Sequence, residues 1–239
     1  MASHSSELDK PENRSAGFAA LFGALSDDLA QDWRIAWNRA AEAGLLRELM
    51  PEAWGGASQS ALSLARTMML LGQLCPDNGF TMGLNSHVWT VQQPLVKFGS
   101  DAQKSRYLPD LCAGRTIGAF ALTEDTSGSD ALAMSMRAEK QGDGYILNGS
   151  KAYIGMAPVC DFAIVFASSA PEKKAWGISA FLVEAGDMGF ERGATQEKTG
   201  LKTLPMGRLS FNACWVPKDR LIGPEGAGAQ IFQTVLDWE

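Results

Sequence analysis

The chain has 239 residues, of which 46% are hydrophobic and 20% are charged, and its formal net charge at pH 7 is -6. This length predicts one or two domains with a sizeable core, and the composition is that of an ordinary soluble globular protein. The acidic balance argues against a nucleic-acid-binding protein, whose usual signature is a basic face.

The spacing of the cysteines argues against a metal site, and the N-terminus lacks the features of a signal peptide. The four cysteines lie far apart without a CxxC pair, and only His4 and His87 accompany them, so we expect buried free thiols and no metal site. Residues 1–16 lack the apolar core of a signal peptide and indicate a flexible tail. Residues 162–167, the most apolar short stretch, cannot span a bilayer. We therefore expect a cytoplasmic protein with no membrane partner.

Residues 17–115 show helical periodicity and predict an N-terminal α-helical domain. One helix is expected from Trp33 to Leu46, and Ser100 with Gln103 forms a capping box that opens another helix through Leu111. His87 lies between apolar stretches and is predicted to be a packed core histidine. A further helix is predicted to bury a face made of Leu62, Ala65, Met69 and Leu70, widened by Leu64, Met68 and Leu71.

Residues 116–224 change to the period of two that is typical of strands. Residues 132–139 alternate apolar and polar side chains and predict a half-buried strand, and Gly142-Asp143-Gly144 predicts the hairpin turn that follows it. The remaining strands are expected at residues 145–147, 161–167, 177–183 and 209–216. A helical pattern returns at residues 227–238, so residues 225–239 are interpreted as the start of a C-terminal helix. Helices followed by strands favour an α+β fold in two segregated units.

The segment FALTEDTSGSD, residues 120–130, is the most informative stretch for function. Gly128 allows a ligand to approach the backbone closely, and Thr123, Thr126, Ser127 and Ser129 offer hydroxyl groups. Composition alone leaves open that this segment is only a turn.

Other candidate motifs are weaker. GPEGAG, residues 223–228, lacks the Lys-Ser/Thr pair and the strand-first context of a phosphate loop, so we interpret it as a linker. Ser127 and Ser129 stand outside any GxSxG motif, which argues against a hydrolase. Glu124 and Asp125 could serve acid–base chemistry, but carboxylates that cap backbone amides are the favoured interpretation.

Four segments together carry a resemblance to the acyl-CoA dehydrogenase family. AFALTEDTSGSD resembles that family's flavin loop, and GYILNGSKAYIG, residues 144–155, resembles its second flavin segment. FGSDAQKSRYLPDL, residues 98–111, and residues 198–228 resemble further family segments in the same order. The resemblance extends from about residue 20 to the last residue, and implies that residues 116–224 form a β-barrel-like middle domain.

The resemblance implies FAD as the cofactor and acyl-thioester oxidation as the reaction. Leu122 and Thr123 occupy positions that hydrogen-bond the pyrimidine side of the flavin, and Ser129 matches a serine near the flavin phosphate and the substrate. Tyr153 replaces a tryptophan that packs along the flavin ring, with a core tyrosine as the alternative. The implied cofactor-binding residues are Phe120, Leu122, Thr123, Gly128, Ser129, Tyr153, Ile154 and Gly155.

The sequence departs from the family pattern within the flavin segments. Gly155 stands where a threonine hydroxyl usually reaches flavin N5, so redox tuning or oxygen reactivity is expected to change. Asp125 replaces a proline, and Thr126-Ser127 replace Gly-Ala, so a different turn geometry is expected. Asp237 matches the aspartate of a substrate-binding motif, with an exposed helix residue as the alternative.

The family's C-terminal helical domain supplies the glutamate base, much of the FAD adenine site and the oligomer core. This chain ends at Glu239 inside an expected helix, so no catalytic residue is assigned. The first hypothesis is one subunit of a split acyl-CoA or acyl-carrier-protein (acyl-ACP) dehydrogenase, with a partner subunit in a homo- or hetero-oligomer. The alternatives are a fragment of an ordinary dehydrogenase and a non-catalytic carrier- or partner-binding relative. APVCD, residues 157–161, resembles members that act on carrier-protein thioesters in natural-product biosynthesis.

Overall fold

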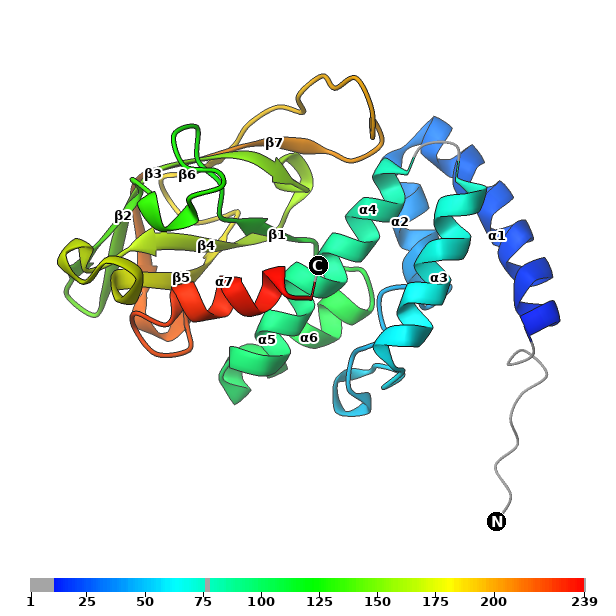
Figure 1. The fold of residues 1–239 in the computed structure, drawn as a ribbon, viewed down its shortest axis with the longest axis horizontal. Helices are drawn as coiled ribbons and strands as arrows, with labels where there is room; N and C mark the ends of the chain where they lie inside the picture. The colour runs from blue at the N-terminus through cyan, green and yellow to red at the C-terminus, as the bar shows by residue number, and fades with distance from the viewer. Residues whose placement is uncertain (1–10, 76–77, 239) are drawn as a thin grey trace, which may run out of the picture.

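The computed structural model describes residues 11–75 and 78–238, and it places a helical unit beside a β-sheet unit (Figure 1). The first unit contains a π-helical turn, η3 (His87–Gln92), between its fourth and fifth helices. Its helices are α1 (Pro11–Gln31), α2 (Trp33–Glu42), α3 (Ala61–Leu74), α4 (Gly79–Ser86), α5 (Gln93–Phe98) and α6 (Asp101–Cys112). Helix α1 thus begins inside the segment that the sequence suggested as a tail, of which residues 1–10 lie outside the described part.

Side-chain caps fix where α2 and α6 begin. The Asp32 carboxylate accepts from the Arg34 backbone N–H at 2.6 Å, which starts α2. The predicted capping box of α6 is confirmed: Ser100 Oγ accepts from the Gln103 backbone N–H, and Gln103 Oε1 accepts from the Ser100 N–H. The same Gln103 amide donates to the carbonyls of Asp219 and Leu221, at 2.8 and 2.9 Å. One side chain therefore caps a helix and ties it to the sheet unit.

The second unit is a single mixed sheet. Its strands are β1 (Gly118–Ala121), β2 (Arg137–Gln141), β3 (Gly144–Gly155), β4 (Phe162–Ser168), β5 (Ile178–Glu184), β6 (Phe190–Arg192), β7 (Met206–Pro217) and β8 (Leu221–Ile222). Their order is β6-β7-β3-β2-β4-β5-β8, with β1 parallel to β4. The path starts at β6 and ends at β8 without closing, so the barrel-like expectation is wrong and the α+β class is confirmed.

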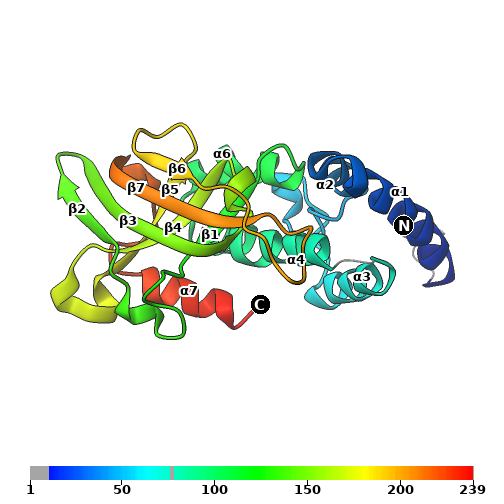
Figure 2. The same cartoon turned by 90° about the horizontal axis from the view of Figure 1, so that it is seen from above.

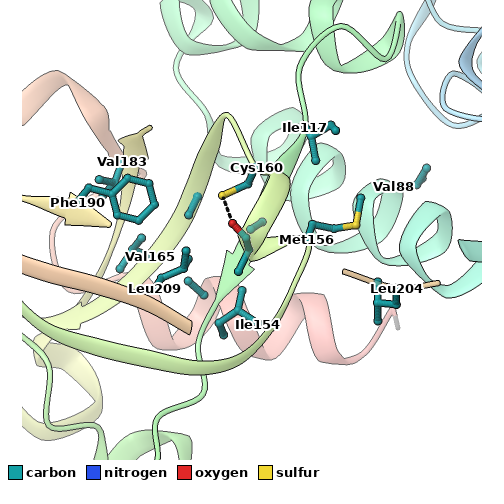
Figure 3. Packing of buried hydrophobic residues seen from close by; sticks show 14 of the residues in the cluster. Val88, Ile117, Ile154, Met156, Cys160, Val165, Val183, Phe190, Leu204 and Leu209 are labelled. Carbon is teal, nitrogen blue, oxygen red and sulfur yellow. Dashed lines mark hydrogen bonds between the residues drawn. The ribbon is translucent and has the colours of Figure 1, made fainter. Parts of the chain in front are cut away.

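Helix α7 (Gly228–Leu236) follows the sheet and packs against β5. Figure 2 shows β3 and β7 running together across the sheet, with α7 along one side. Two clusters of buried side chains hold these layers together. The larger cluster joins both units, because Val88 of η3, Ile154 of β3 and Met156 just after β3 belong to it (Figure 3). His87 is a core residue as predicted, 1% exposed, with its ring edge-on to Trp37.

Two local predictions are wrong. The expected buried face of α3 is displaced: Leu62 and Met69 are 59% and 65% exposed, whereas Leu64, Thr67 and Leu71 are buried. Apolar residues lie on several sides of this helix, and its packing against α1 and α4 selects the buried side. Residues 132–136 are not a strand, because the backbone N–H groups of Ser135 and Met136 donate to the Glu124 carboxylate instead of to a neighbouring strand.

The predicted hairpin is confirmed, since Gln141 pairs with Gly144 and Gly142 has a φ of 59°. Within residues 11–75 and 78–238, no helix is long and apolar enough to cross a membrane. The same ranges contain no cluster of three or more His, Cys, Asp or Glu side chains suited to a metal ion.

Candidate functional site

The loop 122–130 follows β1 directly and lies against β3. The Ala152 N–H donates to the Thr123 carbonyl at 2.9 Å, and Lys151 Nζ donates to the Leu122 carbonyl at 2.9 Å. The loop then turns on itself, because the Glu124 N–H donates to the Ser127 carbonyl and Ser127 Oγ donates to the Asp130 carbonyl. The first half of the loop is thus held against β3, and residues 128–130 at its tip are exposed.

A buried ion pair anchors the loop from inside. Lys151 Nζ lies 3.0 Å from Glu124 Oε1, and the two side chains are 0% and 3% exposed. The Glu124 carboxylate also accepts from the Ser135 N–H and Oγ, both at 2.6 Å, and from the Met136 N–H at 3.0 Å. Every oxygen of this carboxylate is therefore used twice, which satisfies the requirement that a buried charge be paired and hydrogen-bonded. Glu124 therefore caps backbone amides, which confirms the favoured sequence interpretation for this residue.

The environment of this pair keeps both partners charged at neutral pH. Burial alone would raise the pKa of Glu124, but the hydrogen bonds from Ser135 and the charge of Lys151 outweigh it, so the pKa is lowered. Burial lowers the pKa of Lys151 to about 8, against the opposing pull of the Glu124 charge.

The lowered pKa of Glu124 predicts acid sensitivity. A carboxyl with a pKa below its ordinary value of 4.5 contributes stability at higher pH, and this contribution is lost as the pH falls through the folded-state pKa. We expect the free energy of unfolding to decline below about pH 5, and the slope to be shallower in the double variant Glu124→Gln with Lys151→Met, which removes the titrating carboxyl without leaving Lys151 buried and unpaired. Urea unfolding between pH 3 and pH 7, followed by tryptophan fluorescence, measures both slopes, and equal slopes would contradict the assignment.

A second ion pair holds the loop from outside. Arg208, on β7, donates to both carboxylate oxygens of Asp125, at 2.5 and 2.8 Å. The two side chains are 41% and 49% exposed. The hydrogen bonds of Asp125 with Arg208 lower the pKa of this carboxyl. The residue that replaces the family proline is thus the one that joins the loop to β7.

Strand β3 carries a bulge beside the loop. Its pairing with β7 shifts between Lys151 and Ile154, and Tyr153 at the bulge has a φ of 57°. The bulge leaves the Tyr153 side chain 61% exposed, while Ile154 points into the core (Figure 3). Tyr153 is therefore a surface aromatic residue and not the core tyrosine that was the alternative. At Gly155 an added Cβ would meet only the Leu204 methyl groups, at 3.8 and 3.9 Å, so its lack of a side chain is not required by packing.

The sequence-predicted site residues divide into three groups. Leu122, Thr123, Tyr153 and Gly155 lie along the junction of the loop and β3, and the structure brings them together. Gly128 and Ser129 are exposed on the loop tip, where a Cβ on Gly128 would meet nothing within 4 Å.

Phe120, Ile154 and Asp237 are placed differently. The Phe120 ring packs edge-on against Phe166, with centroids 5.0 Å apart, and supports the loop from behind. The buried Ile154 can offer a ligand only its backbone. Asp237 is exposed at the C-cap of α7.

The structure also assigns roles that sequence reasoning did not single out. Lys151 lies inside the segment 144–155. The available signal was an isolated lysine between apolar strand residues, with a carboxylate in the neighbouring motif. Arg208 gave no comparable signal, because its partner is 83 residues away.

A groove of about 530 Å³ begins where the loop ends. Asp130, Arg137 and Lys174 bring charges to it, and Ser168 lies at its wall. The whole lining comprises Asp130, Leu132, Ala133, Met134, Arg137, Ser168, Pro171, Lys174, Ala175 and Ile178. The two cations suit an anionic group at the groove, and the apolar lining suits a neutral chain.

Two protein-family models match this chain. Residues 25–115 match the family described as "Acyl-CoA dehydrogenase, N-terminal domain", and residues 119–214 match "Acyl-CoA dehydrogenase, middle domain". An L-prolyl-[peptidyl-carrier protein] dehydrogenase of Pseudomonas fluorescens is 36% identical over 204 residues, which cover 85% of this chain and 54% of that protein. The human mitochondrial short-chain specific acyl-CoA dehydrogenase is 38% identical over 194 residues, covering 81% and 47%.

Solved structures show the same similarity. The crystal structure of the prolyl acyl carrier protein oxidase AnaB superimposes with a TM-score of 0.87 at 31% identity, and the match covers 94% of this chain and 62% of AnaB. The FAD complex of PigA gives a TM-score of 0.85 at 32% identity, over 100% and 64%. The chain spans about half the length of the curated relatives that it matches.

Proposed function

Because the chain belongs to the acyl-CoA dehydrogenase family, we propose that it forms the flavin- and substrate-facing wall of an FAD-dependent α,β-dehydrogenase of acyl thioesters. The observation that carries the proposal is the loop 122–130, held against β3 next to the bulge that turns Tyr153 outward. We propose that this activity is cytoplasmic.

The residues at this junction fit one side of a flavin. The exposed ring of Tyr153 offers a flat surface for stacking, and Leu122 and Thr123 offer backbone and hydroxyl groups to the pyrimidine edge. The open space at Gly128 permits close approach, and the Ser129 hydroxyl is assigned to the phosphate and thioester side. When bound, FAD supplies the acceptor for the hydride that leaves the substrate's β-carbon.

Neither Glu124 nor Asp125 is suited to remove the substrate's α-proton. Glu124 is buried with four hydrogen bonds, and Asp125 is held by Arg208. A base must be free to reach the proton and to accept it. We therefore propose that the base belongs to the family's C-terminal helical domain, on the same polypeptide or on a partner subunit. We propose that Asp237, at the end of α7, faces the substrate.

The groove beside the loop is proposed to take the pantetheine arm of the thioester. This arm is common to CoA and to carrier proteins, and its neutral chain ends in a phosphate. The apolar lining from Leu132 to Met134 suits the chain, and Arg137 and Lys174 suit the phosphate. The named substrates of the prolyl-carrier-protein relatives favour a carrier-bound substrate, and the human relative's name keeps acyl-CoA as the alternative.

This assignment predicts a defect in substrate binding. Arg137→Ala and Lys174→Ala are each expected to raise KM by about five-fold with little change in kcat, since an exposed charge contact contributes about 1 kcal/mol. Lys173→Ala is the matched control, because Lys173 is exposed next to Lys174 but does not line the groove. Steady-state kinetics on acyl-pantetheine, acyl-CoA and acyl-carrier substrates measures the effect. An equal rise in all three variants would contradict the groove assignment.

The proposed function is tested on the full protein from its source, with any chain that copurifies. We expect bound FAD, and we expect its absorbance to bleach when a saturated acyl thioester is added. Flavin-free protein, or a flavin that no acyl thioester reduces, would refute the proposal and favour a non-catalytic relative. Intact mass separates the remaining forms, because a source polypeptide far above 25.6 kDa indicates one long chain and a second copurified helical chain indicates a split enzyme.

A further inference from the structure

Resting on the proposed function, we infer that Asp125 and Arg208 are positioning residues that latch the tip of the flavin-facing loop onto the outside of the sheet. The latch consists of the two hydrogen bonds from the Arg208 guanidinium to the Asp125 carboxylate. It acts on the exposed part of the loop, residues 125–130, and is distinct from the buried Lys151–Glu124 pair.

The side chains of Glu124 and Asp125, which are adjacent in the loop, point in opposite directions. Glu124 turns inward to a lysine of β3, and Asp125 turns outward to an arginine of β7. The loop is thereby fixed from both faces of the sheet at adjacent residues. These two ion pairs add to the hydrogen bonds that already hold residues 122–124 against β3.

Arg208 is placed opposite the bulge that presents Tyr153. In the β3–β7 pairing, Lys151 faces Leu209 and Ile154 faces Gly207, so the two bulge residues of β3 lie across from residue 208. The guanidinium reaches over β3 on its way to Asp125 and lies 3.4 Å from Ser150 Oγ. One side chain therefore contacts the bulged strand and holds the loop, which are the two elements that carry the proposed flavin contacts.

The exposure of the pair determines what the latch controls. Arg208 and Asp125 are about half exposed, and such pairs add little to global stability. A planar guanidinium that binds both carboxylate oxygens still fixes geometry as well as charge. The tip has few buried side chains, so its local opening can change without unfolding the sheet. The latch is therefore expected to tune loop order and cofactor affinity while the fold stays intact.

Hydrogen exchange and flavin binding together test the latch in the full protein. Asp125→Asn and Arg208→Gln are each expected to speed amide exchange in residues 125–130 by about five-fold and to weaken FAD binding by a similar factor. Arg208→Lys keeps the charge without the two-pronged contact and is expected to fall in between. Raising the salt concentration from 50 mM to 1 M should speed amide exchange in residues 125–130 of the wild type by a similar factor. The same change in salt should leave exchange in Asp125→Asn and Arg208→Gln unchanged.

Charge reversal and a matched ion pair supply the controls. The double variant Asp125→Arg with Arg208→Asp is expected to recover slow loop exchange, which a purely structural loss would not do. Arg115→Gln removes a different exposed ion pair, with Asp110, and should leave the loop unaffected. Loop exchange that is unchanged in both neutral variants overturns the latch. If the wild type binds no FAD, the proposed function fails, and the exchange data still decide whether the latch exists.

Discussion

Replacing Lys151 with Met is expected to lower the free energy of unfolding by about 3–5 kcal/mol, because it strands a charged partner inside the protein. The Glu124 carboxylate is 3% exposed and would lose its counter-ion, and the Leu122 carbonyl would lose a donor at 2.9 Å. The remaining donors, from Ser135 and Met136, cannot neutralise the charge. Urea unfolding followed by tryptophan fluorescence and by circular dichroism measures the loss. We also expect Lys151→Met to lose bound FAD, because Lys151 holds both Leu122 and Glu124.

Lys140→Met is the matched control for this substitution. Lys140 forms an ion pair of similar length, 2.7 Å, with Glu225, but its side chain is 65% exposed. Loss of an exposed pair costs about 1 kcal/mol or less. The double variant Glu124→Gln with Lys151→Met should be more stable than Lys151→Met alone, because it removes both buried charges. Equal losses in Lys151→Met and Lys140→Met would show that burial does not set the strength of the inner pair.

The parts of the fold that depend on short-range chemistry could be predicted from the sequence. The Ser100–Gln103 capping box, the hairpin at Asp143 and the order of helices before strands all follow from residues within a few positions of one another. The loop 120–130 was recognised because glycine and hydroxyl residues are concentrated there, whereas its contact with β3 was found only in the structure.

The features that depend on distant partners could not be predicted in the same way. Residues 132–136 alternate apolar and polar side chains as a strand does. The backbone N–H groups of Ser135 and Met136 nevertheless donate to the Glu124 carboxylate, and no local sequence pattern reveals this. The bulge at Tyr153 depends on the register of β3 with β7. Whether the sheet closes into a barrel likewise depends on pairing between strands that lie far apart in the chain. The sequence therefore located the candidate site, whereas the interactions that hold it together came from the structure.

Phe166→Ala is expected to cost about 3–5 kcal/mol of unfolding free energy and to disturb both sides of the candidate site. Phe166 is 0% exposed on β4 and touches two aromatic rings that belong to different elements. Its centroid lies 5.0 Å from Phe120 of β1 and 5.6 Å from Phe232 of α7, in edge-on contacts. The first contact supports the strand that leads into the loop, and the second holds the helix that leads to Asp237.

The coupling of these two contacts gives the substitution a specific signature. A cavity at Phe166 should speed hydrogen exchange in α7 and in the loop 122–130 together, because both lose the same packing partner. Trp176→Ala removes a larger ring that is 77% exposed, and its effect on unfolding should stay within about 0.5 kcal/mol. If Phe166→Ala loosens α7 and leaves the loop unchanged, Phe120 is held by other contacts, and the loop and the end of α7 are independent. If both loosen, one buried ring sets the position of the proposed flavin contacts relative to the proposed substrate contact.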